Sequence, residues 1–468
     1  MRTSPDRRIG GSLHGAALAV LALLSAYPPV RLPAQDTSAI DRGVRIGIIY
    51  RPGVRPGLVV LPGPAPALDS VRVIIARDLD LSDRFELITL PGGDSIRVTA
   101  GAPAPPGRPA TGGRGGAAAG LNYPLYQALG ADFAVGIGVA GDTTVLVVHD
   151  VAAGGVRREV RTKLPPLKDA GFRMAVHRLA DRILEATLGV GGIAATRILF
   201  VMDGRVYMID QDGADRQLVS ASDHQAMSPA WAPDGRRFAY MEFSAGHGQL
   251  FVQPLGSGRR QPVVTTGQAL DFTPAFSPDG KTLAFSRATE EGTDIYTVNI
   301  KDNCCLQRLT VGRFSDNLSP TYSPDGQRIA FVSTRPGLPQ IYVMAADGTD
   351  QQLFAPFDYG VTGSSNAPDW SPDGRSVAFH RDVGGTLQVF VLDVRTRAVR
   401  QLTSLGRNED PTWAPDSRHL AFVSDRSGYR QLWIIDLETG RIRPLLQQSG
   451  ARLPAWSPRL PETASSTP

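Results

Sequence analysis

Cysteine, the residue that most often marks a disulfide framework or a metal site, is nearly absent from this chain. Only two cysteines occur among the 468 residues, and they are neighbours, Cys304 and Cys305. Adjacent Cα atoms lie about 3.8 Å apart, closer than is usual in a disulfide, so we expect no structural cross-link between them. Two adjacent thiols with no histidine nearby also make a poor zinc site. The sequence therefore predicts neither a metal site nor a cofactor.

Linear motifs of catalysis are missing as well. The chain contains no G-x-S-x-G nucleophile turn, no H-E-x-x-H zinc motif and no G-x-x-x-x-G-K-S/T phosphate loop. Its seven histidines are scattered along the sequence rather than grouped. These absences favour a protein that is not an enzyme.

The chain also lacks a strong charge of one sign. Lys and Arg number 49 against 45 Asp and Glu, a net charge of +4, and no run or stripe of basic residues stands out. Binding to nucleic acid depends on a basic patch or stripe. We therefore expect no nucleic-acid partner.

Long apolar runs are limited to one segment near the N-terminus, Ala16 to Ala26. Three arginines within the first eight residues precede it, and Leu32-Pro33-Ala34 offers a small-residue cleavage point. This is the layout of a signal peptide over residues 1–34. The run is short for a bilayer span; a membrane anchor or a buried helix is the alternative. No cysteine follows for a lipid anchor, so we expect an exported protein that is at most peripheral to the membrane.

Glycine and proline are abundant, at 50 and 37 residues, and many of them fall in one repeated phrase. It reads PAWAPDGRRFAY, PAFSPDGKTLAF, PTYSPDGQRIAF, PDWSPDGRSVAF and PTWAPDSRHLAF, with a broken sixth copy, PAWSPRL. The copies begin at Pro229, Pro274, Pro320, Pro368, Pro411 and Pro454. Repeats of roughly 45 residues with several short strands each are typical of β-propeller blades.

The two ends of the repeat array complement each other. Five segments supply four strands each, whereas Thr196 to Ser220 matches only strands two, three and four of a blade. The terminal Pro454 to Ser457 matches a first strand with nothing after it. We therefore predict a six-bladed β-propeller over residues 194–460, closed by its C-terminal strand, with 461–468 as a loose tail. An open stack of hairpins or a β-sandwich is the alternative.

Residues 35–190 have a different pattern, which predicts an α/β domain. Leu58 to Leu61 and three segments between Phe133 and Lys163 are strand-like, as are Val44 to Tyr50 and Phe85 to Leu90. A helix beginning at Ser70 would bury Ile74, Ile75 and Leu79 on one side, Tyr123 to Leu129 is a short helix, and Leu167 to Leu188 is a longer amphipathic helix. The Gly/Pro/Ala-rich stretch 101–120 is expected to be a disordered insertion, and Gly189 to Gly192 a linker.

Two sets of residues recur at fixed blade positions. The aromatic set is Trp231, Phe276, Tyr322, Trp370, Trp413 and Trp456, and the acidic set is Asp234, Asp279, Asp325, Asp373 and Asp416. We interpret the aromatics as packing between blades rather than as a ligand cage. We interpret the carboxylates as turn residues, because five carboxylates in five separate turns do not converge on one metal.

Loops that enter the innermost strands surround one mouth of a propeller's channel. Here these loops are polar and differ from blade to blade, as expected of a recognition surface on a rigid scaffold. The candidate partner-binding residues are His224, Asp271, Thr273, Asp316, Asn317, Asn366, Arg407, Asn408 and Asp410. The alternative for each is a solvated turn residue.

The repeat phrase, the junction GGIAATRILFV from Gly191 and the closing LPAWSPRL, Leu453 to Leu460, together resemble the TolB family. The resemblance implies a periplasmic, monomeric protein of the Tol–Pal system, which supports outer-membrane integrity and constriction at cell division. It implies binding of a Pal-like lipoprotein through the propeller and of a TolA-like protein through the mature N-terminus. The sequence departs from the family at the insertion after Ala100 and at Gln35 to Gly43. The alternative function is an enzyme acting on a glycan or peptide in the channel, since a carboxylate pair there would leave no linear signature.

Overall fold

The computed structural model describes residues 55–63, 68–89, 121–221, 224–244, 247–263, 269–313, 315–357 and 363–462. These residues belong to one compact unit, Tyr50–Pro468. The predicted signal peptide 1–34, the strand at Val44 to Tyr50, the insertion 101–120 and the last six residues lie outside the described residues. Within the described part of the chain, no helix combines the length and apolarity that crossing a bilayer requires.

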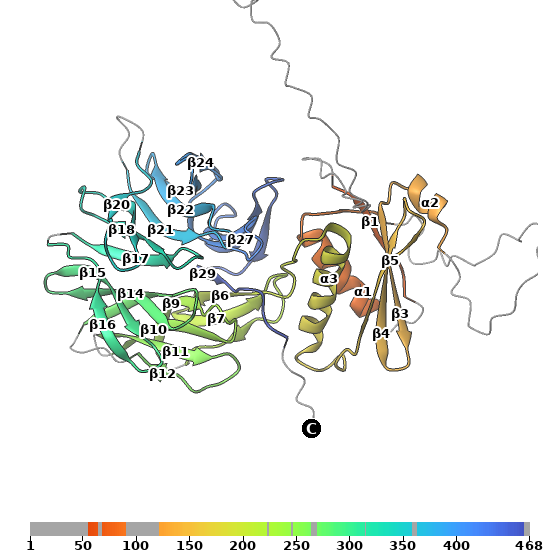
Figure 1. The fold of residues 1–468 in the computed structure, drawn as a ribbon, viewed down its shortest axis with the longest axis horizontal. Coiled ribbons are helices and arrows are strands. Elements are labelled where there is room, and N and C mark those ends of the chain that lie inside the picture. Colours follow the sequence, from red (N-terminus) through yellow and green to blue (C-terminus); the bar gives the residue numbers. More distant parts are fainter. Residues whose placement is uncertain are drawn as a thin grey trace, which may run out of the picture. The chain divides into compact units, whose positions relative to one another are not determined.

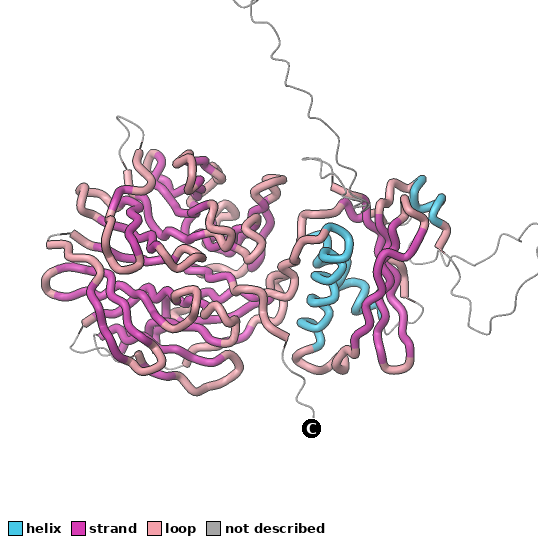
Figure 2. The backbone as a smooth tube through the Cα atoms, viewed as in Figure 1, coloured by secondary structure: helices cyan, strands magenta, loops and turns pink. Residues whose placement is uncertain are grey.

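The α/β domain is a five-stranded sheet of order β2-β1-β3-β4-β5 with two helices, α1 and α3, beside it (Figures 1 and 2). The strands are β1 (Gly57–Val60), β2 (Glu86–Leu87), β3 (Phe133–Ala140), β4 (Thr143–Asp150) and β5 (Gly155–Thr162), and the helices are α1 (Asp69–Leu81), α2 (Tyr123–Ala128) and α3 (Phe172–Leu188). β1 pairs in parallel with β2 and β3, and β3, β4 and β5 form the predicted antiparallel meander.

The apolar spacing of the two long helices explains their position. Val71, Ile75 and Leu79 of α1 recur on one face and are buried, together with Val176 and Ile183 of α3, in one core cluster with the sheet. The sequence placed the start of α3 too early. Residues 165–171 form a turn instead, in which the Asp169 carboxylate accepts the backbone N–H of Gly171, so the helix begins at Phe172.

The propeller consists of six four-stranded antiparallel sheets, whose innermost strands are β29, β9, β13, β17, β21 and β25 (Figure 1). Blade 1 is β29 (Arg452–Trp456), β6 (Arg197–Met202), β7 (Arg205–Asp210) and β8 (Gln217–Leu218). Blades 2 and 3 are β9 (Gln225–Trp231), β10 (Arg237–Ser244), β11 (His247–Pro254), β12 (Gln261–Pro262), β13 (Leu270–Phe276), β14 (Thr282–Thr289), β15 (Gly292–Asn299) and β16 (Cys304–Arg308). Blades 4 and 5 are β17 (Asn317–Tyr322), β18 (Arg328–Ser333), β19 (Gln340–Ala345), β20 (Gln352–Leu353), β21 (Ser365–Trp370), β22 (Ser376–Val383), β23 (Thr386–Asp393) and β24 (Val399–Gln401). Blade 6 is β25 (Asn408–Trp413), β26 (His419–Ser424), β27 (Gln431–Asp436) and β28 (Ile442–Leu446).

The predicted closure of the ring is confirmed. The C-terminal β29 pairs antiparallel with β6, so that Trp456 lies opposite Ile198. The Trp456 indole Nε1 donates to Thr196 Oγ1 at 2.9 Å, and its backbone N–H donates to Thr412 Oγ1 of blade 6 at 3.2 Å. The last strand therefore joins the first and sixth blades through side chains as well as through the sheet.

The repeated aromatic and acidic positions have the roles expected of them. The indoles of Trp231 and Trp413 donate at 3.1 Å to the backbone carbonyls of Ala455 and Asp369, which belong to the neighbouring blades. Asp325 stays within its own turn, where its carboxylate accepts the Ser323 hydroxyl and the Gln327 backbone N–H. These hydrogen bonds hold the pKa of Asp325 below its usual range.

The junction between domain and propeller is more ordered than the term linker suggests. Gly189 ends α3 with a left-handed φ of 68°. The Asp181 carboxylate of α3 then accepts the backbone N–H groups of Ala194 and Ala195 at 2.8 and 3.0 Å. A Cβ atom at Gly192 would lie 1.9 Å from Asp181 Oδ1, so only glycine fits there.

The start of the predicted loose tail is bound to the same helix. The Pro461 carbonyl accepts from Arg178 Nη2 at 3.0 Å, and Glu462 pairs with Arg182 at 2.6 Å. The tail prediction was therefore wrong for these two residues, because two arginines of α3 face the chain where it leaves β29.

Candidate functional site

The innermost strands enclose a central channel of about 460 Å³. Two rings of proline line it: Pro229, Pro274, Pro320, Pro368, Pro411 and Pro454, and then Pro233, Pro278, Pro324, Pro372, Pro415 and Pro458. Each proline of the first ring begins a copy of the repeat phrase. Each proline of the second ring stands four positions later in the same copy. Proline lacks a backbone N–H and fixes φ, so this lining is rigid and offers few donors.

Each innermost strand bulges at the same point. The residue before the first-ring proline has a positive φ in every blade: Ser228, Thr273, Ser319, Ala367, Asp410 and Leu453, with values between 48° and 55°. The pairing with the second strand shifts register across this point in all six blades. None of these residues is glycine, so the conformation is strained and the surrounding ring must hold it.

Two carboxylates, Asp369 and Asp410, are the only ones among the described channel-lining residues. Burial raises the pKa of Asp369 to about 6, although its Oδ2 accepts the Trp413 backbone N–H at 2.7 Å. Burial, together with the charge of Glu409, raises the pKa of Asp410 to about 7. An acid with such a pKa can move protons in catalysis, but Asp369 is already engaged in joining blades 5 and 6.

The direction of the strands gives the propeller two different faces. The turns between strands two and three and the loops from strand four into the next blade lie on one face, which we call the mouth face. The turns between strands one and two and between three and four lie on the other, the turn face. The α/β domain contacts the turn face, where Arg441 of the β27–β28 turn pairs with Asp80 at 2.9 Å and Asp83 at 3.0 Å. The mouth face carries all the loops predicted to bind a partner.

Three of the predicted residues are buried on that face. Asn317 and Asn408 are fully buried and Asp271 is 2% exposed. Asn317 Nδ2 donates to Asp294 of the preceding blade at 2.9 Å, and Asn408 Nδ2 donates to Gln388 of its preceding blade at the same distance.

Arginines complete these buried connections. Arg287 binds both carboxylate oxygens of Asp271 at 2.8 and 3.1 Å, and Arg426 donates to Asn408 Oδ1 at 2.9 Å. Each guanidinium also lies over aromatic rings of its own blade. We assign Asn317 and Asn408 a structural role in joining blades, and Asp271 a structural role in an ion pair within blade 3; a direct contact with a partner would need exposure that they lack.

Thr273 and Asp410, the predicted residues with positive φ, face the channel. Thr273 Oγ1 lies 2.6 Å from Ser286 Oγ, and the Asp410 backbone N–H donates to His380 Nδ1 at 3.1 Å. Burial and the charge of Arg407 lower the pKa of His380 to about 4, so the ring is neutral, and the N–H of Asp410 that it faces identifies Nδ1 as the accepting nitrogen.

The remaining predicted residues keep access to solvent. Asp316 is exposed, and His224, Asn366 and Arg407 are partly exposed. Arg407 Nε pairs with Glu409 at 2.9 Å, with 41% of the arginine side chain exposed. For these four, the prediction that they contact a partner stays a prediction.

Sequence reasoning missed the apolar component of the mouth face. Six large apolar side chains there are at least 41% exposed: Phe243, Val311, Leu338, Val383, Leu405 and Tyr429. They lie at the ends of β10 and β22, in the two–three turns of blades 4 and 6, and in the loops that follow blades 3 and 5. The other exposed large apolar residues in the described propeller, Leu218, Leu306 and Leu353, are 36% to 41% exposed and lie on outermost strands. We call these six side chains the apolar rim. In the sequence, the signal for them is an apolar residue among Gly, Ser or Arg residues.

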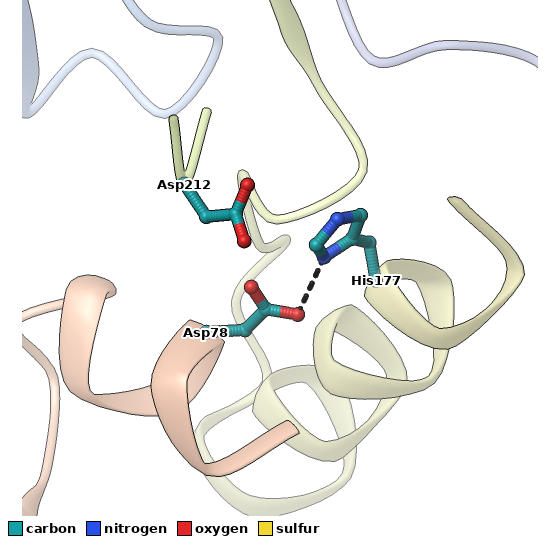
Figure 3. A group of neighbouring side chains, drawn as sticks. All are labelled: Asp78, His177 and Asp212. Atoms are coloured by element: carbon teal, nitrogen blue, oxygen red, sulfur yellow. Dashed lines mark hydrogen bonds and ion pairs between the residues drawn. The ribbon is translucent and has the colours of Figure 1, made fainter. Parts of the chain in front are cut away.

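Two groups among the described residues have donor atoms within 4.8 Å of one another, as a metal would require: Asp78, His177 and Asp212 (Figure 3), and Asp83, His419 and Asp436. Both lie where the α/β domain meets the turn face. In each, an arginine already pairs with one carboxylate, Arg173 with Asp212 and Arg418 with Asp436. A metal ion would have to displace these guanidinium groups, so the residues present fit ion pairs better than a cation.

Fold and site together define a class: a rigid six-bladed propeller with an α/β domain on one face and an open, apolar-rimmed face on the other. The family model of the TolB beta propeller domain matches residues 184–358 and 359–464, more than half of the chain. The chain belongs to the TolB family.

Individual relatives agree with this assignment. The chain is 32% identical over 183 residues to the Tol-Pal system protein TolB of Bordetella pertussis. The matched segment covers 38% of this chain and 41% of that protein. It is similar to the same degree to the protein of that name from Bordetella bronchiseptica. The chain thus spans about 41% of the length of these curated relatives. The crystal structure of TolB from Acinetobacter baumannii has the same fold, with a TM-score of 0.71 and 24% identity over 87% of this chain and 98% of that one.

Proposed function

We propose that this protein is a periplasmic protein-binding scaffold of the Tol–Pal system, which acts by binding rather than by catalysis. It would link a Pal-like, peptidoglycan-associated lipoprotein to the inner-membrane Tol proteins, and so support outer-membrane integrity and constriction at cell division. Membership of the TolB family supports the system, since its curated relatives are named as Tol-Pal system proteins. The apolar rim on the mouth face is the observation that carries the binding role.

The chemistry of the rim favours a folded protein as partner. Monomeric proteins rarely expose large apolar side chains together unless that surface binds something. Tyr429 and Leu405 are each 65% exposed and come from blades 6 and 5, whose strands are adjacent in the ring. Polar side chains such as Asp316 and Arg407 lie on loops of the same face. Apolar side chains beside polar ones are the usual composition of a specific interface.

Binding of the soluble domain of the same organism's Pal-like lipoprotein to the full mature chain tests the proposal, by isothermal titration calorimetry. Tyr429→Ala and Leu405→Ala should each weaken binding by about tenfold or more, since aromatic and aliphatic anchors at an interface centre contribute at least ~1.4 kcal/mol. Leu353→Ala, a substitution of a 41% exposed leucine on the outermost strand β20, is the matched control and should leave the affinity unchanged.

Two results would contradict this. If the two proteins do not associate at micromolar concentration, the Pal-like domain is not the partner. Equal loss of affinity for Leu353→Ala and Leu405→Ala would overturn the mouth face as the docking surface while leaving the partner intact.

The polar part of the interface is proposed at Asp316, Asn366 and Arg407, with His224 beside it. Arg407→Ala should slow association and make it less sensitive to salt, as expected when a rim charge is removed. Arg375→Ala is its control, because Arg375 lies in the β21–β22 turn on the turn face and its side chain is 84% exposed. The TolA-like contact is proposed for Gln35 to Gly43, and deletion of that segment should abolish it without affecting the Pal-like partner.

A further inference from the structure

The contact between the α/β domain and the propeller is built from charges. Each apolar core cluster of the described residues lies within one domain or the other, apart from residues of the short junction and of the C-terminal segment. The contacts across the interface are polar instead: Arg77 and Arg173 with Asp212, Arg84 with Asp416, and Arg441 with Asp80 and Asp83. The orientation of the two domains therefore depends on ion pairs rather than on apolar burial.

His177 is the centre of the first of two buried bridges in this interface (Figure 3). It belongs to α3 and is fully buried. Its Nδ1 lies 2.7 Å from Asp78 Oδ2 of α1, and its Nε2 lies 3.6 Å from Asp210 Oδ2 of β7. The ring thus stands between a carboxylate of the α/β domain and a carboxylate of blade 1.

His419 forms the second bridge, with the domains exchanged. It belongs to β26 of blade 6 and is also fully buried. Its Nδ1 lies 2.8 Å from Asp416 Oδ2 of the propeller, and its Nε2 lies 3.5 Å from Asp83 Oδ2, just beyond the end of α1. Each domain therefore contributes one histidine that reaches a carboxylate of the other.

The positions of the carboxylates favour the charged form of both rings. In each ring Nδ1 lies at hydrogen-bond distance from one carboxylate and Nε2 lies within ion-pair distance of a second, although neither Nε2 makes a hydrogen bond among the described residues. A positive ring is attracted to both carboxylates, whereas a neutral ring that donates from Nδ1 would turn the lone pair of Nε2 toward the second one. Burial alone would lower the pKa of His177, but the hydrogen bond with Asp78, the nearby Asp210 carboxylate and the charges of Asp78 and Asp212 outweigh burial and raise the pKa to about 10. The pKa of His419 is likewise raised, because Asp416 and Asp83 outweigh its burial.

The other charges around the rings are already balanced by partners. Near His177, Arg173 and Arg77 pair with Asp212, and Arg197 pairs with Asp210 at 2.9 Å. The Asp181 carboxylate, which also interacts electrostatically with His177, is held by two backbone N–H groups. Near His419, the arginines pair with the acids in three sets: Arg418 with Asp436 and Glu438, Arg84 with Asp416, and Arg441 with Asp83. The arginines leave one negative charge at each bridge without a matching positive charge. The positive charge of the imidazolium balances it.

We propose that His177 and His419 form an electrostatic clasp, in which two buried imidazolium bridges fix the α/β domain on the propeller and couple the stability of the two. The clasp engages only blades 1 and 6, the two blades that β29 joins. The α/β domain therefore closes over the seam of the ring, and Arg178 of α3 additionally holds the chain just after β29. A weaker clasp should therefore also lower the stability of the closure between blades 1 and 6.

The test is differential scanning calorimetry of the full mature chain with His177→Gln, His419→Gln and both substitutions. Glutamine keeps a hydrogen-bond donor but carries no charge. The wild-type protein should unfold in one transition, and the double variant should show two, one for each domain. His380→Gln is the matched control, a substitution of a buried histidine inside the propeller that is neutral and not at the interface, and it should keep the single transition.

A pH series on the wild-type protein gives a second readout that does not depend on a substitution. The pKa of His177 is raised on folding, so its contribution is complete below its unfolded pKa of about 6.5 and is lost as the pH rises through about 10. The two transitions should therefore separate above about pH 10, and the double variant should show two at every pH.

Two findings would overturn the clasp. One is a single transition in the double variant at neutral pH that coincides with that of the wild type. The other is binding of Zn²⁺ or Mn²⁺ to the wild-type protein that His177→Gln abolishes, because a metal there would replace the proton that the bridge requires.

Discussion

Replacement of Trp456 by alanine tests how the ring is held closed. Trp456 is 6% exposed, packs in the core shared by blades 1 and 6, and makes the two hydrogen bonds to Thr196 and Thr412. Removing a buried tryptophan costs about 3–5 kcal/mol. The lost indole hydrogen bond adds about 1 kcal/mol. The expected loss is therefore about 4–6 kcal/mol, nearly all of it attributable to the seam.

Trp370 supplies the matched control for this experiment. It occupies the same strand position in blade 5 and is 5% exposed, but its Nε1 has no hydrogen-bond partner among the described residues. Trp370→Ala also loses the contact of the ring with the Arg328 guanidinium, whose Cζ lies 4.8 Å from the ring centre, so both alanine variants should cost about 4–6 kcal/mol and the phenylalanine variants isolate the hydrogen bond. Trp456→Phe, which keeps most of the apolar volume, should lose about the hydrogen bond alone, whereas Trp370→Phe should be nearly neutral.

Urea denaturation followed by circular dichroism measures these differences. The midpoints should fall in the order wild type, Trp370→Phe and Trp456→Phe, with the two alanine variants lowest and an unchanged slope. A Trp456→Phe protein that is no less stable than Trp370→Phe would contradict a role of the indole hydrogen bond, because it would show that the seam carries no more than any other contact between blades.

Further predictions concern the closing strand, the junction and the channel. Removal of Leu453 to Pro468 strips most of β29 and should abolish cooperative melting of the propeller, whereas removal of 463–468 alone should leave the melting temperature unchanged. Gly192→Ala places a Cβ atom 1.9 Å from Asp181 Oδ1 and should cost about 2 kcal/mol in urea denaturation, while Gly258→Ala, with open space around it, should be neutral. Asp369 has a pKa raised to about 6, so its ionisation lowers stability as the pH rises from about 4 through 6; Asp369→Asn should remove up to about 3 kcal/mol of this pH dependence, and an unchanged pH profile would contradict the burial of that carboxylate.

The propeller could be predicted from the sequence because every blade repeats the same local order of strand and turn residues. The turn at Pro324-Asp325-Gly326 and the strands around it are determined by residues a few positions apart, and the match of Thr196 to Ser220 with Pro454 to Ser457 needs only a count of strands. The helix α1 was predicted for the same reason, since the spacing of its apolar residues is itself a local signal.

The candidate site could be predicted only in part, because its members depend on neighbours in other blades. Asn317 and Asn408 look like solvated loop residues in the sequence, yet they are buried by residues of the preceding blade about 20 positions away. Burial of this kind follows from how the blades pack, which no linear pattern records. The apolar rim was missed because a single exposed Leu405 or Tyr429 has no periodicity to mark it.

The clasp depends on still longer separations. Asp83 and His419 lie 336 positions apart in the sequence, and His177 and Asp210 lie 33 apart. The seven scattered histidines gave no sign that two of them meet carboxylates from another domain. Such a site emerges only when the α/β domain is placed over blades 1 and 6.

The mouth face of the closed propeller is proposed to bind a Pal-like lipoprotein domain. Calorimetric titration of that domain into the wild-type chain, Tyr429→Ala and Leu353→Ala decides this. We expect micromolar or tighter binding to the wild type and to Leu353→Ala, and affinity reduced about tenfold or more in Tyr429→Ala at unchanged thermal stability. Equal affinity of all three proteins, or no binding by any of them, would contradict it.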